Sequence, residues 1–74
     1  MPEIKWGDTV RIRMGASAAM RPGALAEVVG IRTVENAPQA RQFGAEVGTR
    51  VYVIEFGDGE SVELAGVWLE AIEP

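Results

Sequence analysis

The feature that most constrains this chain is the dipeptide Asp58-Gly59, which separates two short runs of strand-forming residues. The run before it is Val51-Tyr52-Val53-Ile54-Glu55-Phe56, and the run after it is Ser61-Val62-Glu63-Leu64. Asp-Gly readily adopts the positive φ angles of a type I′ turn, whose twist matches that of the strands on either side. The pattern therefore predicts a β-hairpin and makes an all-β fold the first expectation.

Further strand patterns precede the hairpin. Val10, Ile12 and Met14 alternate with polar residues, which predicts a strand with one buried face. A second strand is expected over residues 24–34, with a bulge or a sharp bend at Gly30. Short strands separated by Gly and Pro in so short a chain are typical of a small closed β-barrel.

The segments around the hairpin complete the predicted order of elements. Residues 51–56 carry apolar side chains on both faces, so we expect this third strand to be central or to have its second face covered. Residues 65–68 predict a single 3₁₀ turn, and residues 69–72 predict the last short strand. Within the long segment 33–49, a possible cap at Asn36 predicts a helix of at most two turns that ends near residue 44.

Length and composition limit the possible functions. A chain of 74 residues has room for one domain, residues 1–74. It contains no cysteine and no histidine, and no metal, cofactor or catalytic motif stands out, so we expect neither a metal site nor an enzyme. A net charge of −4 argues against nucleic-acid binding. No apolar run approaches the ~20 residues of a membrane span and no secretory signal is visible, which predicts a cytoplasmic protein without membrane attachment.

The order of the motifs resembles that of SH3-like barrels in bacteria, particularly the barrel of the nitrile hydratase β subunit and the plasmid-borne type II dihydrofolate reductases. The motifs that carry the resemblance are Gly7-Asp8-Thr9-Val10-Arg11-Ile12, Arg21-Pro22-Gly23, Glu27-Val28-Val29-Gly30, Tyr52-Val53-Ile54-Glu55-Phe56, Val62-Glu63-Leu64 and Trp68-Leu69-Glu70. The resemblance implies a five-stranded SH3-like barrel with a short helical insertion, residues 33–49, between the second and third strands.

The resemblance implies little about enzymatic activity. In the type II reductases the active pore depends on a Val-Gln-Ile-Tyr run, and this chain has Ser61-Val62-Glu63-Leu64 at that place. Glu63 would repel the anionic folate and the phosphorylated nicotinamide. The nitrile hydratase barrel is an accessory that packs against a metal-bearing partner, which leaves an accessory or partner-binding role. Small chains of this character are common products of mobile gene cassettes.

The sequence therefore predicts a non-catalytic protein-interaction or accessory module that binds a protein partner or itself. Homo-oligomers are expected, held partly by the apolar second face of the third strand. Phe43 is expected either to tether the insertion to the barrel or to contact the partner. The candidate partner-binding residues are Arg41, Gln42, Phe43, Tyr52 and Trp68.

Two other classes of function stay open. One is a small-molecule or enzymatic site at an oligomer axis. The other is a nucleic-acid-binding barrel. The residues that would contact the nucleic acid are Arg11, Arg13, Arg32, Arg50 and Trp6. Trp6 and Trp68 are further expected to meet where the barrel closes, or else to form an exposed aromatic pair.

Overall fold

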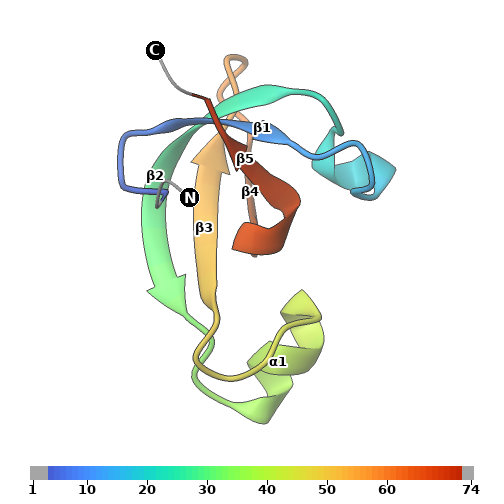
Figure 1. Ribbon diagram of the computed structural model, residues 1–74, viewed down its shortest axis with the longest axis vertical. Coiled ribbons are helices and arrows are strands. Elements are labelled where there is room, and N and C mark those ends of the chain that lie inside the picture. Colours follow the sequence, from blue (N-terminus) through green and yellow to red (C-terminus); the bar gives the residue numbers. More distant parts are fainter. Residues whose placement is uncertain (1–3, 73–74) are drawn as a thin grey trace.

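The computed structural model, which describes residues 4–72, is a five-stranded antiparallel sheet with one short α-helix (Figure 1). The strands are β1 (Thr9–Ile12), β2 (Leu25–Thr33), β3 (Arg50–Glu55), β4 (Ser61–Ala65) and β5 (Leu69–Ala71). The helices are η1 (Ala18–Met20), α1 (Ala37–Phe43) and η2 (Gly66–Trp68), of which η1 and η2 are single 3₁₀ turns. The strand order β4-β3-β2-β1-β5 confirms the predicted all-β class and the place of the helix between the second and third strands.

The two edge strands of this sheet are neighbours in the chain. β4 and β5 are separated only by the three residues of η2, although each pairs with a different strand inside the sheet. No ladder joins β4 to β5 within residues 4–72. The described sheet is therefore open, with its two edges connected by one tight turn.

The predicted hairpin is confirmed, but the predicted type I′ turn is wrong. Such a turn needs positive φ at both central residues, and of the pair only Gly59 has one, at 88°. The amide of Gly59 donates to the carbonyl of Phe56 over 3.0 Å, and the amide of Phe56 donates to the carbonyl of Glu60 over 2.8 Å. The loop is thus the three-residue type that ends in a left-handed glycine. Asp58 keeps ordinary backbone angles while its Oδ1 accepts the amide of Glu60 over 3.0 Å.

The bulge expected near Gly30 is confirmed. The register of β2 against β3 shifts between Val28, which lies opposite Ile54, and Gly30, which lies opposite Val53. Val29 is therefore the extra residue. Such a bulge bends a strand and increases its twist. The bend lets β2 pair with β1 along one part of its length and with β3 along another.

The main core lies between the inner faces of the strands. Its buried members are Val10, Ile12, Ala16, Ala26, Val28, Tyr52, Ile54, Phe56, Leu64 and Leu69. The expectation that Met14 continues the buried face of the first strand is wrong, because its side chain is 76% exposed. β1 ends at Ile12, and the amide of Arg13 donates to the carbonyl of Trp68 as the chain leaves the sheet.

A second, smaller cluster lies on the opposite face of β3. Its buried members are Val34, Val51 and Ala65, and Ala40, Phe43, Ala45 and Trp68 pack against it. Figure 1 shows α1 at one end of the long axis of the molecule, beside the ends of β2 and β3. The prediction that the second face of the third strand is covered is confirmed. Because that cover comes from the same chain, Val51 offers no surface to a second copy.

The helix α1 follows its sequence signals. The Oδ1 atom of Asn36 accepts the amide of Gln39 over 3.0 Å, and the Oε1 atom of Gln39 accepts the amide of Glu35 over 2.9 Å. These bonds satisfy backbone donors at the start of the helix, as in a capping box. Gly44 ends it with a left-handed φ of 62°. None of the helices described between residues 4 and 72 is long and apolar enough to cross a membrane.

Candidate functional site

The five residues predicted to bind a partner fall into two regions of the structure. Arg41 and Gln42 are exposed on α1, and Phe43 is half-buried at its end. Tyr52 is buried, with 5% of its surface exposed, and Trp68 is half-buried in η2. Trp68 packs against both hydrophobic clusters and so lies between the two regions. Whether these residues bind a partner stays a prediction.

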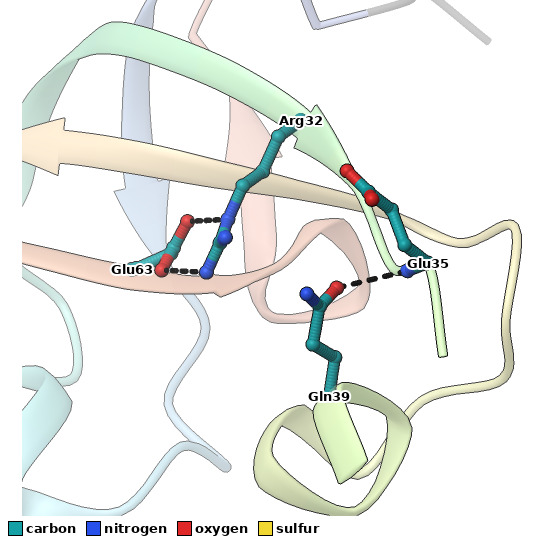
Figure 2. Close-up of polar contacts among 4 residues, drawn as sticks. All are labelled: Arg32, Glu35, Gln39 and Glu63. Atoms are coloured by element: carbon teal, nitrogen blue, oxygen red, sulfur yellow. Dashed lines mark hydrogen bonds and ion pairs between the residues drawn. The ribbon is translucent and has the colours of Figure 1, made fainter. Parts of the chain in front are cut away.

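The first region, which we call the α1 clamp, consists of Arg32, Glu63 and Phe43. Figure 2 shows the side chain of Arg32 reaching from β2 to Glu63 on β4, with two hydrogen bonds between them. The Nη2 atom of Arg32 donates to Oε1 of Glu63 over 2.7 Å, and its Nε donates to Oε2. The guanidinium carbon lies 5.4 Å from the centre of the Phe43 ring, within range of a cation–π contact.

The clamp fixes the helix to the sheet. The pKa of Arg32 is raised above its ordinary value, mainly because its guanidinium donates hydrogen bonds to Glu63. Arg32 is therefore a permanent cation that joins two strands, and Phe43 inserts between it and the second cluster. This geometry supports the tethering alternative for Phe43. No local sequence pattern indicates the pairing, because Arg32 and Glu63 come from strands that are not neighbours in the sheet.

A second combination of an arginine, a carboxylate and a phenylalanine ring lies beside the hairpin. Nη1 of Arg21 lies 3.0 Å from Oδ2 of Asp58, and its guanidinium carbon lies 4.5 Å from the centre of the Phe56 ring. The amide of Glu60 and the cation of Arg21 together hold the pKa of Asp58 below its ordinary value of 3.8. Arg21 is the only non-glycine residue with positive φ, at 58°, in the part of the chain that the structure describes.

The second region is an open cleft beside η2, which we call the η2 cleft. Its lining includes two aromatic residues, Tyr52 and Trp68, and two arginines, Arg13 and Arg50. The exposed side chain of Val67 and the strand β5 complete one side. The space measures about 1050 Å³ and is open rather than enclosed. Small-molecule sites usually enclose most of their ligand, so this shape suits a segment of a larger partner better.

The wall of the cleft is built on a close contact between Gly66 and Tyr52. A Cβ atom placed on Gly66 would lie 2.8 Å from Cε2 of the Tyr52 ring. Real Cβ atoms do not approach so closely, and the ring is held in the main core. Only glycine therefore lets the backbone of η2 approach this ring so closely. The contact fixes where Val67 and Trp68 project.

Arg13 is fixed to the same turn. Its amide donates to the carbonyl of Trp68 over 2.9 Å, and its Nε donates to the carbonyl of Val67 over 3.0 Å. This is the one side-chain hydrogen bond of Arg13 among residues 4–72. The guanidinium plane is thus oriented, while its two terminal nitrogens donate to no other described group.

The arginines considered for nucleic-acid binding do not gather on one surface. Arg13 and Arg50 line the cleft, whereas Arg32 is held by Glu63. Trp6 is 72% exposed and its Nε1 donates to the carbonyl of Val29 over 3.1 Å. Trp68 packs against both clusters and Trp6 belongs to neither, so the structure does not bring the two tryptophans together where the sheet edges meet or as an exposed pair. Between residues 4 and 72, no group of three or more potential ligands could hold a metal ion.

Comparison with known proteins assigns the chain to no family, since no family model, curated protein or solved structure matches it. The resemblance to SH3-like barrels therefore rests on the sequence motifs alone.

Proposed function

We propose that this protein is a non-catalytic SH3-like barrel that acts as a protein-interaction module and binds its partner at the η2 cleft. The observation that carries the proposal is the cleft itself, in which Trp68 and the 69% exposed Val67 lie beside two arginines. Aromatic and arginine side chains are the groups that most often dominate binding at protein interfaces. The three-residue connection between the two edge strands supports the barrel, because it draws those edges together.

The carboxylates of the hairpin support a role without catalysis. Asp58 is bound to Arg21 and Glu63 to Arg32, so the acids that the sequence places near one another serve two separate arginines. A carboxylate held by an arginine is a poor general base, because the cation favours its charged form. The chain also has no histidine or cysteine to act in its place.

Position-specific crosslinking tests the proposal. Val67 lies in the cleft, and Val47, which follows α1, is the same residue type with a comparable exposed fraction of 58%. A photoreactive phenylalanine analogue at position 67 should give protein adducts in cells that produce the chain, and the same analogue at position 47 should not. The adducted protein, once identified and purified, should bind the unmodified chain. No adducts, or equal adducts at both positions, would contradict the proposed function.

A further inference from the structure

We infer that the sheet carries a second interaction surface around Trp6, and that this surface takes an arginine from a basic segment of a partner protein. The surface, which we call the Trp6 face, consists of Trp6, Leu25, Glu27, Val29 and Glu55. The partner's arginine stacks on the indole and pairs with the two glutamates, while a neighbouring aliphatic side chain lies against Leu25 and Val29. None of these residues lines the η2 cleft, so the inference does not depend on the proposed function.

An exposed aromatic ring in a fixed position is the first observation. Trp6 is 72% exposed, and the bond from its Nε1 to the carbonyl of Val29 holds the indole against β2. The loop that carries Trp6 is bound to the same strand, because the amide of Gly7 donates to the carbonyl of Val28 over 2.8 Å. An indole that is oriented before binding loses little side-chain freedom in a complex, and its face attracts a guanidinium.

Apolar side chains accompany the indole along β2. Val29 and Leu25 are both exposed, and Val29 is the extra residue of the bulge whose carbonyl binds Trp6. Leu25 lies two residues before Glu27 and therefore on the same face of the strand. Exposed apolar residues bordered by charged ones are typical of interaction surfaces.

Two opposed carboxylates give this surface its charge. Glu27 on β2 lies directly opposite Glu55 on β3, and both residues are exposed. Opposite side chains in an antiparallel pair have Cβ atoms about 5 Å apart, and like charges at such positions lower stability. Neither carboxylate forms an ion pair or a hydrogen bond with any group between residues 4 and 72. A cation supplied by a partner would therefore meet two carboxylates at once and remove the repulsion between them.

The basic side chains of the chain do not neutralise this pair. All seven lie within residues 4–72, so no lysine or arginine stands outside the described range. Arg13, Arg21 and Arg32 are bound elsewhere, and Arg41 lies on α1. Lys5 and Arg11 form no ion pair with a described residue. Arg50 begins β3 and Glu55 ends it, and their odd separation places the two side chains on opposite faces.

A basic protein segment fits the Trp6 face better than other occupants do. Within residues 4–72, no group of three or more potential ligands could hold a metal ion. The phosphates of a nucleic acid would be repelled by the two glutamates. A second copy of this chain carries a net charge of −4 and would be repelled as well. An arginine beside aliphatic residues matches both the ring and the carboxylates.

The test measures binding of fluorescent octapeptides to the unmodified protein by anisotropy at low salt. The arginine probe alternates arginine with valine, and two reference probes have lysine or glutamine in place of every arginine. The arginine probe should bind at least about tenfold more tightly than the glutamine probe, and its affinity should fall as salt rises. It should also bind about threefold more tightly than the lysine probe, because a guanidinium stacks on an indole while it pairs with a carboxylate.

Three variants connect this binding with the Trp6 face. Glu27→Gln with Glu55→Gln should lose the preference for the arginine probe over the glutamine probe. The matched control, Glu35→Gln with Glu46→Gln, makes the same charge change at exposed glutamates on either side of α1 and should keep it. Trp6→Leu should bind the arginine and lysine probes equally.

Thermal unfolding guards against loss of folding as the explanation. The variant Glu27→Gln with Glu55→Gln should melt no lower than the parent, because it removes a repulsion between opposite residues. A lower melting temperature, equal loss of binding in the control variant, or equal binding of any two probes by the parent would each overturn the inference. A dimer of the parent that Trp6→Leu dissociates would also overturn it, since a second copy would then cover the Trp6 face.

Discussion

The α1 clamp and the η2 cleft contain similar residues, but these residues have different interactions in the two regions. Each combines arginine, an aromatic ring and a glutamate, and Trp68 of the cleft packs against the same second cluster as Phe43 of the clamp. In the clamp, Glu63 accepts two hydrogen bonds from Arg32, and the ring of Phe43 lies against the cation. In the cleft, the side chain of Arg13 donates only to a backbone carbonyl, within residues 4–72. The same chemistry therefore joins two strands and the helix in one region, whereas in the other the side chain of Arg13 is bonded to the backbone of η2.

Strand order explains the difference. Arg32 on β2 and Glu63 on β4 flank β3, opposite Val51 and Val53 on its two sides, so the sheet register brings a carboxylate to the arginine. Glu70 on β5 lies opposite Arg11 in the ladder with β1, away from such a pairing with Arg13. The position of the carboxylate in the sheet, and not the residue types, decides that Arg32 is paired with Glu63 and Arg13 is not.

Removal of one apolar side chain from each region is the strongest test of this comparison. Phe43→Ala takes away a ring that contacts both Arg32 and the second cluster, and we expect it to lower the free energy of unfolding by about 2 to 3 kcal/mol. Val67→Ala shortens a side chain that is 69% exposed, and its effect should stay within about 0.5 kcal/mol. Urea unfolding measures both. Similar losses in the two variants would mean that the cleft is braced like the clamp.

The close contact under the cleft gives the next effect. Gly66→Ala drives a Cβ atom into the ring of Tyr52, and we expect a loss of about 2 kcal/mol from overpacking. Gly57→Ala is the matched control, because a Cβ there meets nothing within 4 Å and its φ is not positive. Thermal unfolding of the two variants should differ clearly. Equal midpoints would show that η2 can move off the ring at little cost.

A smaller change in stability is expected at Arg21, whose contacts with Asp58 and Phe56 offset the strain of its backbone. Arg21 has a φ of 58°. This left-handed backbone conformation raises the conformational energy of any residue that has a Cβ atom. Arg21→Ala removes the contacts and keeps the strain, whereas Arg21→Gly removes both. The glycine variant should be more stable than the alanine variant by about 1 kcal/mol. Denaturant midpoints in the reverse order would mean that the left-handed backbone carries no strain.

The smallest expected effect is a change in acid sensitivity. The pKa of Asp58 lies below 3.8 in the folded chain, so its contribution to stability is present above that pH and is lost as pH falls through the folded pKa. Asp58→Asn lacks this contribution, and its melting temperature should fall less between about pH 4 and about pH 2 than that of the parent. Glu60→Gln is the control, since Glu60 forms no ion pair in the described structure. A parallel fall in all three proteins would contradict the expected role of Asp58.

Local sequence signals predicted most of the fold. Strand periodicity located the strands to within about two residues, and Asn36 and Gly44 bounded α1 because capping is a local interaction. The errors came from contacts distant in the chain. Met14 continues the alternation of β1, yet β1 stops where Arg13 binds Trp68. The turn at Asp58 depends on bonds from its side chain, and so it departs from the type that Asp-Gly alone favours.

The candidate site was predictable only in part. The sequence singled out Tyr52 and Trp68, which do line the cleft, because large aromatic residues in a small chain stand out. It did not connect them with Arg13 and Arg50, which reach the cleft from the end of β1 and the start of β3. Nor did it distinguish Arg13 from Arg32, since only the sheet order shows which of them meets a carboxylate. The exposed Val67 in the predicted tight turn was the one signal that could have located the surface.

The pairing of β5 with β1 has a consequence for the rates at which this chain folds and unfolds. Val10 lies opposite Ala71, so this ladder joins distant parts of the chain, whereas the β3–β4 hairpin closes over a short loop. Contacts between distant residues require a larger loss of chain entropy and tend to form late. Changes in late-forming contacts act mainly on the rate of unfolding. If the proposed partner binds in the η2 cleft, which β5 lines, it should therefore slow the unfolding of the whole chain and lengthen the lifetime of the folded protein.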